Sequence, residues 1–186
     1  MKILLAVDGS AYTKKMLAYV AAHDELFAAS NEFTLVTAQT PLPPRARAAV
    51  GADIANQYYA DEATKVTGPV VKFLKRHGID AKVVTKVGAA GEFIAKTANA
   101  GKFDLVMMGS HGHSALGNLV MGSVATQVLA HCKVPVLLVH GEQDDVVPVA
   151  CAEQLQASAA HATLLVVPGR HDSFDDEAAL NERVTA

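Results

Sequence analysis

The sequence has few cysteines, no long hydrophobic run and little net charge, and each of these absences excludes a class of protein. Its two cysteines, Cys132 and Cys151, lack the spacing of a CxxC pair or of a metal-binding group, so neither a disulfide framework nor a zinc site is expected. No apolar stretch approaches the roughly 18 residues that would span a membrane, and no secretory leader is recognisable. The net charge of -3 and the pI near 6.2 provide no basic surface for nucleic acid. We therefore expect a soluble, cytoplasmic protein with one core.

The two commonest nucleotide-binding signatures are also missing. The dinucleotide fingerprint needs three closely spaced glycines and the P-loop needs Gly-Lys-Ser or Gly-Lys-Thr, and the chain has neither. It has instead the array Gly109-x2-Gly112-x9-Gly122-Ser123, directly after the apolar run Leu105–Met108. Glycines just beyond a parallel strand let backbone N–H groups approach an anion, and a following helix adds partial positive charge. The array predicts a phosphate-binding loop, and the simpler alternative is a tight turn that needs positive φ at one or two positions.

Hydrophobic periodicity predicts alternating strands and helices. Short apolar runs are typical of strands that are buried on both faces of a parallel sheet, and they occur at 2–7, 33–38, 81–85, 105–108 and 134–139. Helical patterns occupy 10–29, 53–77, the stretch from Glu92 to Gly101, and the stretch from Leu116 to Leu129. Because successive parallel strands are joined by right-handed crossovers, we expect a doubly wound, Rossmann-like α/β sheet with strand order 3-2-1-4-5.

In this order the first and fourth strands are neighbours at the point where the winding reverses, which is where such sheets bind ligands. Asp8 follows the first strand and the Gly109 loop follows the fourth, so both are expected to face one crevice. An aspartate at position 8 can have either of two roles. It can contact a ligand, or it can be the N-cap of the helix that begins near Ser10.

The glycine array, the opening MKILLAVDGS and the strand VPVLLVH together resemble the universal stress protein family, in its ATP-binding branch, over roughly residues 1–140. The resemblance implies a five-stranded, HUP-like α/β domain, ATP at the carboxyl ends of the strands, alone or with Mg²⁺, and homodimers that pair through the fifth strand. It implies that the nucleotide contacts Ala6, Val7, Asp8, Ala38, Gly109, Ser110, Gly112, Gly122, Ser123 and Val124.

Within that site, the loop amides and Ser123 are expected to hold the phosphates, and Asp8 is expected to orient the ribose or a phosphate-bound Mg²⁺. No general base is evident for rapid hydrolysis, so ATP turnover is expected to be slow or absent.

Two neighbouring features have plainer interpretations. The proline-rich, basic segment Pro41–Arg47 could act as a lid with its arginines on the phosphates, but it is more typical of a solvated loop. His111 and His113 alternate in the glycine loop without a cysteine or carboxylate spaced to complete a zinc site. We interpret them as loop histidines near phosphate and predict no metal site built from side chains.

The C-terminal segment, residues 141–186, resembles the last part of an α/β-hydrolase. In that fold a strand leads to Gly-x-x-Asp with the triad acid, then to a helix, a strand and Gly-x-His with the triad base. Here Asp144 ends GEQD, a helix is predicted over about 149–159, a strand over Thr163–Val167, and His171 ends PGRH. The resemblance makes Asp144 the acid and His171 the base of an esterase-like hydrolase.

A triad also needs a serine on a strained G-x-S-x-G elbow. Ser114 is the nearest match, but Leu116 occupies the position of the second glycine. Ser10 lies nearer the position that a hydrolase requires, but Asp8 stands where the first glycine belongs. We therefore favour nucleotide binding over hydrolysis, with a scaffold without activity as a third alternative.

The two resemblances predict a single α/β domain over 1–186, with a universal-stress-protein-like portion at 1–140 and a hydrolase-like extension at 141–186. The clean switch near His140 favours an engineered chimera over a natural one. The added strand is expected beside the fifth, giving the order 3-2-1-4-5-6, with a closing helix over Glu177–Val184. Because that strand would occupy the edge through which the family's dimers pair, we expect this dimer to be lost.

Overall fold

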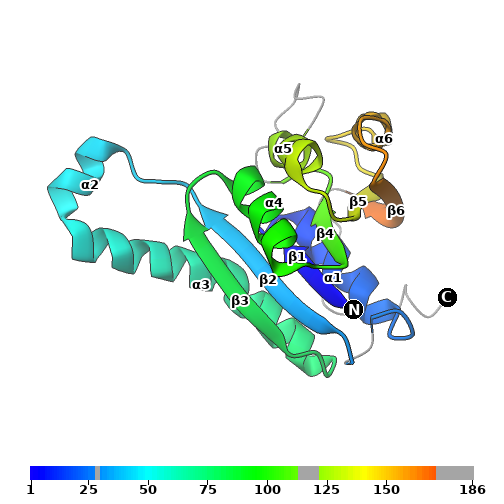
Figure 1. The fold of residues 1–186 in the computed structure, drawn as a ribbon, viewed down its shortest axis with the longest axis horizontal. Helices are drawn as coiled ribbons and strands as arrows, with labels where there is room; N and C mark the ends of the chain where they lie inside the picture. The colour runs from blue at the N-terminus through cyan, green and yellow to red at the C-terminus, as the bar shows by residue number, and fades with distance from the viewer. Residues whose placement is uncertain (28–29, 113–121, 171–186) are drawn as a thin grey trace.

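The computed structural model describes residues 1–27, 30–112 and 122–170, which form one sheet with helices on both faces (Figure 1). The strands are β1 (Lys2–Ala6), β2 (Glu32–Gln39), β3 (Ala81–Val87), β4 (Leu105–Gly109), β5 (Val136–Gln143) and β6 (Ala162–Arg170). The helices are α1 (Ala11–Ala22), α2 (Pro44–Val50), α3 (Ala52–Arg76), α4 (Ala90–Gly101), α5 (Ser123–His131) and α6 (Val149–Ala157).

All strand pairs are parallel, and the strands follow the order β3-β2-β1-β4-β5-β6. The predicted doubly wound α/β fold and its order 3-2-1-4-5-6 are therefore confirmed. The sixth strand pairs with β5 from Ala162 to Arg170, with one irregularity in register between Gly141 and Gln143. Since β5 lies between β4 and β6, it is not an edge strand.

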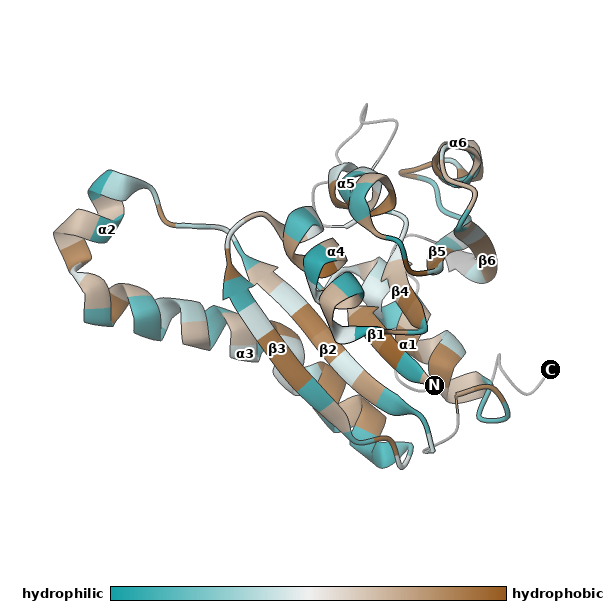
Figure 2. Cartoon of the chain, viewed as in Figure 1, coloured by the Kyte–Doolittle hydropathy of each residue, from teal (hydrophilic) through white to brown (hydrophobic). Residues whose placement is uncertain are grey.

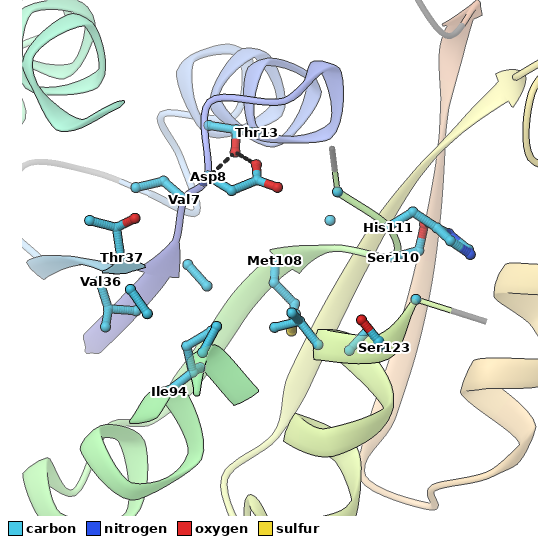
Figure 3. Close-up of a pocket in the computed structure, with 18 residues that line it drawn as sticks. Val7, Asp8, Thr13, Val36, Thr37, Ile94, Met108, Ser110, His111 and Ser123 are labelled. Atoms are coloured by element: carbon cyan, nitrogen blue, oxygen red, sulfur yellow. Dashed lines mark hydrogen bonds between the residues drawn. The ribbon is translucent and has the colours of Figure 1, made fainter. Parts of the chain in front are cut away.

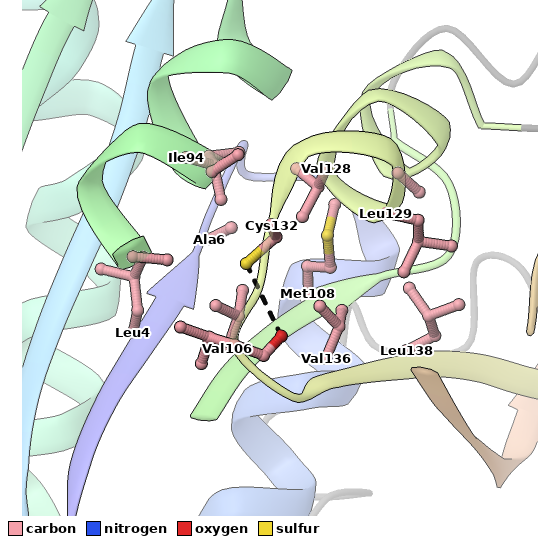
Figure 4. Close-up of a cluster of buried hydrophobic side chains, with 14 of the residues drawn as sticks. Leu4, Ala6, Ile94, Val106, Met108, Val128, Leu129, Cys132, Val136 and Leu138 are labelled. Atoms are coloured by element: carbon pink, nitrogen blue, oxygen red, sulfur yellow. Dashed lines mark hydrogen bonds between the residues drawn. The ribbon is translucent and has the colours of Figure 1, made fainter. Parts of the chain in front are cut away.

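The core consists of two layers, one on each face of the sheet, and β1 contributes to both. Leu4 and Ala6 belong to the layer beneath α4 and α5 (Figure 4), whereas Ile3, Leu5 and Val7 belong to the layer with α1 and α3. Successive side chains of a strand point to opposite faces of its sheet. A strand that is covered on both faces therefore needs the continuous apolar run that marked β1 in the sequence.

The segment Pro41–Arg47 differs from the prediction of an irregular loop, because helix α2 begins within it at Pro44. Proline suits the first helical position, where its missing N–H would have had no intrahelical acceptor. Arg45 and Arg47 lie exposed on α2. Helix α2 and the first part of α3 extend away from the sheet, and hydrophilic residues occur along this part of α3 (Figure 2).

Most other predicted elements occur within a few residues of their expected ends, but the helix predicted over 10–29 ends at Ala22. The predicted helix 53–77 is α3, the predicted helix 149–159 is α6, and the predicted strand 163–167 is the middle of β6. His113, Ser114, Leu116, His171 and the helix expected over Glu177–Val184 lie outside the described residues. Within the described part of the chain, every helix is too short or too polar to cross a membrane.

Candidate functional site

A pocket lies at the switch point, where β1, β2 and β4 end and where α4 and α5 begin (Figure 3). Its lining includes all ten residues that the family resemblance assigns to a nucleotide: Ala6, Val7, Asp8, Ala38, Gly109, Ser110, Gly112, Gly122, Ser123 and Val124. It also includes Thr13, Val36, Thr37, Ala90, Ile94, Met108, His111 and Ala125. The fold thus brings the predicted set together, while its contact with a nucleotide stays a prediction.

Asp8 projects from the end of β1 at one side of this pocket, and neighbouring groups fix its orientation (Figure 3). Its Oδ1 accepts hydrogen bonds from the Thr13 hydroxyl at 2.8 Å and from the Ser10 amide at 2.9 Å. Ser10 is the N-cap of α1, since its side chain accepts the Thr13 amide. The interpretation of Asp8 as the N-cap is therefore wrong, and its exposed carboxylate lines the pocket.

The three glycines of the array are required by close approach and not by backbone conformation. None of Gly109, Gly112 and Gly122 has the positive φ that a left-handed turn demands. A Cβ on Gly112 would collide with the Asp8 carboxylate, and a Cβ on Gly122 would collide with the backbone carbonyl of Ser110. At Gly122 the loop therefore passes closer to its own return segment than any side chain would allow, and at Gly112 a side chain would have to displace the Asp8 carboxylate. The absence of positive φ contradicts the tight-turn alternative for these positions.

The pocket has an apolar end and a polar end. Val36, Ile94 and Met108 line it beside the ends of β2 and β4 (Figure 3). The other end is lined by the glycine loop and by Ser123, the first residue of α5. Backbone N–H groups at a helix N-terminus carry partial positive charge and attract anions. The arrangement suits a molecule with an apolar ring at one end and a negative group at the other.

Asp144, the predicted triad acid, lies outside this pocket lining and is buried, with 8% of its surface exposed. Its Oδ2 accepts the Tyr12 hydroxyl at 2.6 Å, and its Oδ1 accepts the amides of Val146 and Val147 at 3.0 and 2.9 Å. Burial first, and then the hydrogen bond to Asp144, raises the pKa of Tyr12 well above its usual value. Among the described residues, no group of three or more His, Cys, Asp or Glu side chains is placed to hold a metal.

Sequence reasoning missed several residues of the pocket. The apolar patterns that contain Ile94 and Met108 predicted only that both residues are buried in the core. An apolar residue in a helix or strand pattern does not reveal a cavity beside it. Thr13 could have been found from its position three residues after Ser10. An N-cap serine typically accepts a hydrogen bond from the backbone amide at that spacing. The second contact of Thr13, with Asp8, depends on the turn between β1 and α1.

The fold and the pocket together define a doubly wound α/β domain with a pocket at its switch point. A sequence model of the Universal stress protein family matches residues 1–140, and the chain belongs to this family. It is 34% identical to a universal stress protein of Synechocystis over 136 residues, which covers 73% of this chain but only 41% of that protein. A universal stress protein of Thermus aquaticus is 31% identical over 146 residues, covering 74% of this chain and 96% of that one.

Solved structures share the fold over the same portion. The hypothetical protein MJ0577 of Methanocaldococcus jannaschii superposes with a TM-score of 0.58 at 26% identity, covering 74% of this chain and 93% of that one. The universal stress protein of Archaeoglobus fulgidus in complex with dAMP has a TM-score of 0.54 at 20% identity, covering 74% and 96%. A family protein of Arabidopsis thaliana with AMP bound has a TM-score of 0.53 at 15% identity, covering 74% and 90%.

Proposed function

We propose that this chain binds an adenine nucleotide, with ATP as the expected ligand, in the pocket at the switch point. The observation that carries the proposal is the convergence of Asp8, the glycine loop and the first turn of α5 on one cavity that also has an apolar end. The solved relatives that hold dAMP and AMP support an adenine nucleotide, and the triphosphate rests on the resemblance of the glycine array to the ATP-binding branch.

Each part of the pocket has a chemical role in this proposal. Val36, Ile94 and Met108 receive the base, with the backbone at Ala38 along its edge. The amides of the glycine loop and the first turn of α5 hold phosphate oxygens, with the Ser123 hydroxyl as a further donor. Asp8 accepts ribose hydroxyls or, when Mg²⁺ accompanies the phosphates, serves as an oxygen ligand of the kind that this ion prefers.

The proposed role is regulatory binding, with slow or absent hydrolysis. Asp8 is the carboxylate on the pocket lining, and its Oδ1 already receives two hydrogen bonds. When Asp8 contacts the ribose or Mg²⁺, no other carboxylate of the described lining is left to activate water.

Calorimetric titration with ATP, with and without Mg²⁺, tests the proposal. Wild type should bind, and Gly112→Ala should bind at least tenfold more weakly, because the new methyl group displaces the Asp8 carboxylate. Gly68→Ala is the control for binding, since Gly68 lies exposed in α3 and outside the pocket lining. Absence of binding by wild type at millimolar ATP would refute the proposal.

We also propose that the hydrolase-like extension, residues 141–186, belongs to the same single domain as 1–140 and has no hydrolase activity. Pairing of β6 with β5 supports one domain, whether the join is an engineered chimera or a natural one. Ser10, one of the two serines considered as a nucleophile, is buried and caps α1, which supports the lack of activity. Because β6 covers the side of β5 that the family's dimers use, we propose that this dimer does not form.

A further inference from the structure

The side chains of the glycine loop lead away from the pocket. Figure 3 shows Ser110 and His111 directed to the side opposite Asp8, although both residues line the pocket. Both are buried, with 0% and 7% of their surfaces exposed. The loop thus presents backbone to the pocket and sends its side chains into a buried polar cluster, whose other members are Tyr12, His140 and Asp144.

A chain of three hydrogen bonds links this loop to the segment that follows β5. Nε2 of His140 lies 3.0 Å from the Val147 carbonyl, which can only accept, so Nε2 carries a proton. In the neutral ring, Nδ1 is then an acceptor, and the Ser110 hydroxyl donates to it at 2.6 Å. The same Ser110 oxygen accepts from Nδ1 of His111 at 3.1 Å. With His140 neutral, these three hydrogen bonds have one consistent set of donors and acceptors.

A second link joins the same segment to the start of the loop. The Tyr12 hydroxyl donates to Asp144, and Asp144 is held in turn by the amides of Val146 and Val147. The Tyr12 Cβ packs so closely on Gly109 that a side chain at that position would collide with it. The loop is thus fixed by Tyr12 at Gly109 and by His140 at Ser110.

We propose that His140 and Asp144 are positioning residues for the polar end of the pocket, so that the segment after β5 sets the affinity of the site. The proposal rests on the nucleotide-binding function proposed above. Backbone amides bind an anion tightly only if their spacing is fixed before the anion arrives, because otherwise binding must also order the loop. The anchors at Asp144 and Val147 lie beyond residue 140, where the family match ends. The segment beyond residue 140 therefore helps to hold the glycine loop in place.

Substitutions at His140 separate this role from simple packing. His140→Phe keeps a buried ring but removes both hydrogen bonds, and His140→Asn restores an acceptor near the position of Nδ1. We expect His140→Phe to weaken ATP binding at least tenfold and His140→Asn to recover part of that loss. His77→Phe is the control, because His77 is exposed at the end of α3 and contacts the Phe73 carbonyl.

Two measurements without ligand keep the test independent of nucleotide binding. The Ser110 amide donates to the Val139 carbonyl at 3.0 Å, so its hydrogen exchange reports whether the loop stays in place. It should exchange at least tenfold faster in His140→Phe and near the wild-type rate in His140→Asn. The ¹⁵N shifts of His111 should show a proton on Nδ1 in wild type and a move toward Nε2–H in His140→Phe.

The outcomes distinguish the two proposals. If wild type binds ATP and His140→Phe binds equally well, the positioning role is wrong. If wild type does not bind ATP, the proposed function is wrong, and the Ser110 exchange still decides the positioning role. Unchanged exchange in His140→Phe would overturn that role whether or not ATP binds. The positioning role is supported if His140→Asn regains both the slow exchange of the Ser110 amide and the affinity for ATP. It is refuted if both variants lose stability equally and their Ser110 exchange rates do not differ.

Discussion

The hydrogen bond between Tyr12 and Asp144 makes a quantitative prediction about stability. Both residues are buried, at 1% and 8% exposure, and the hydroxyl lies 2.6 Å from the carboxylate oxygen. Tyr12→Phe removes the donor and leaves Asp144 with its two backbone amides. Because a buried carboxylate then lacks one charge-assisted partner, the free energy of unfolding near neutral pH should fall by about 1.5–3 kcal/mol.

The same contact predicts how this difference changes with pH. Burial and the neighbouring Asp144 raise the pKa of Tyr12 in the folded state, while the unfolded chain ionises its tyrosines near pH 10. Above about pH 10 the folded protein retains a proton that the unfolded chain releases, so stability falls as pH rises. The contribution of Tyr12 is complete below pH 10 and falls by about 1.4 kcal/mol for each pH unit above it. The Tyr12→Phe variant lacks this contribution.

Urea unfolding of wild type and Tyr12→Phe at pH 8 and pH 11 measures both effects. The stability difference between the two proteins should be about 1.4 kcal/mol smaller at pH 11 than at pH 8, with similar m-values. Tyr58→Phe is the control, since Tyr58 is 44% exposed, and it should change stability little at either pH. A stability difference that is the same at both pH values would refute the assigned contact.

Two further predictions concern the loop and the extension. Gly122→Ala should lower the free energy of unfolding by about 1–3 kcal/mol, measured by urea unfolding, and should abolish ATP binding, because its Cβ meets the Ser110 carbonyl. Gly68→Ala, at an exposed position of α3 outside the pocket lining, should leave ATP binding unchanged, and an equal loss of binding in the two variants would contradict the close-approach argument. A chromogenic ester assay should give the same background rate for wild type and His171→Ala, and a rate that the substitution removes would show that the extension is a hydrolase.

Much of the fold could be predicted because a doubly wound sheet requires recognisable hydrophobic patterns in the sequence. Continuous apolar runs mark strands that are covered on both faces, and helical stripes between them require parallel crossovers. The start of α2 was the main miss. Helix α2 is only seven residues long and lies at the surface, so it has neither a periodic apolar face nor a buried contact to reveal it.

The candidate site could be predicted in part, because Asp8 and the glycines follow strands whose carboxyl ends meet at the switch point. The reason why glycine occupies positions 112 and 122 could not be predicted. A sequence offers positive φ and close approach as equal explanations, and only the distance from Gly112 to Asp8 and from Gly122 to Ser110 separates them. Likewise, Asp144 resembled a catalytic acid by its local motif, whereas its hydrogen bond to Tyr12 spans 132 positions of the chain.

The sequence by itself determined the strands, the helices and their parallel connections, because these follow from periodicities that are local in the chain. Right-handed crossovers then left few possible strand orders, among them the observed one. Only the tertiary structure decided that Ser110 faces His140, that Tyr12 reaches Asp144, and that the segment after β5 therefore supports the glycine loop. Contacts between side chains distant in sequence depend on how strands and helices pack in three dimensions, and no local pattern encodes that packing.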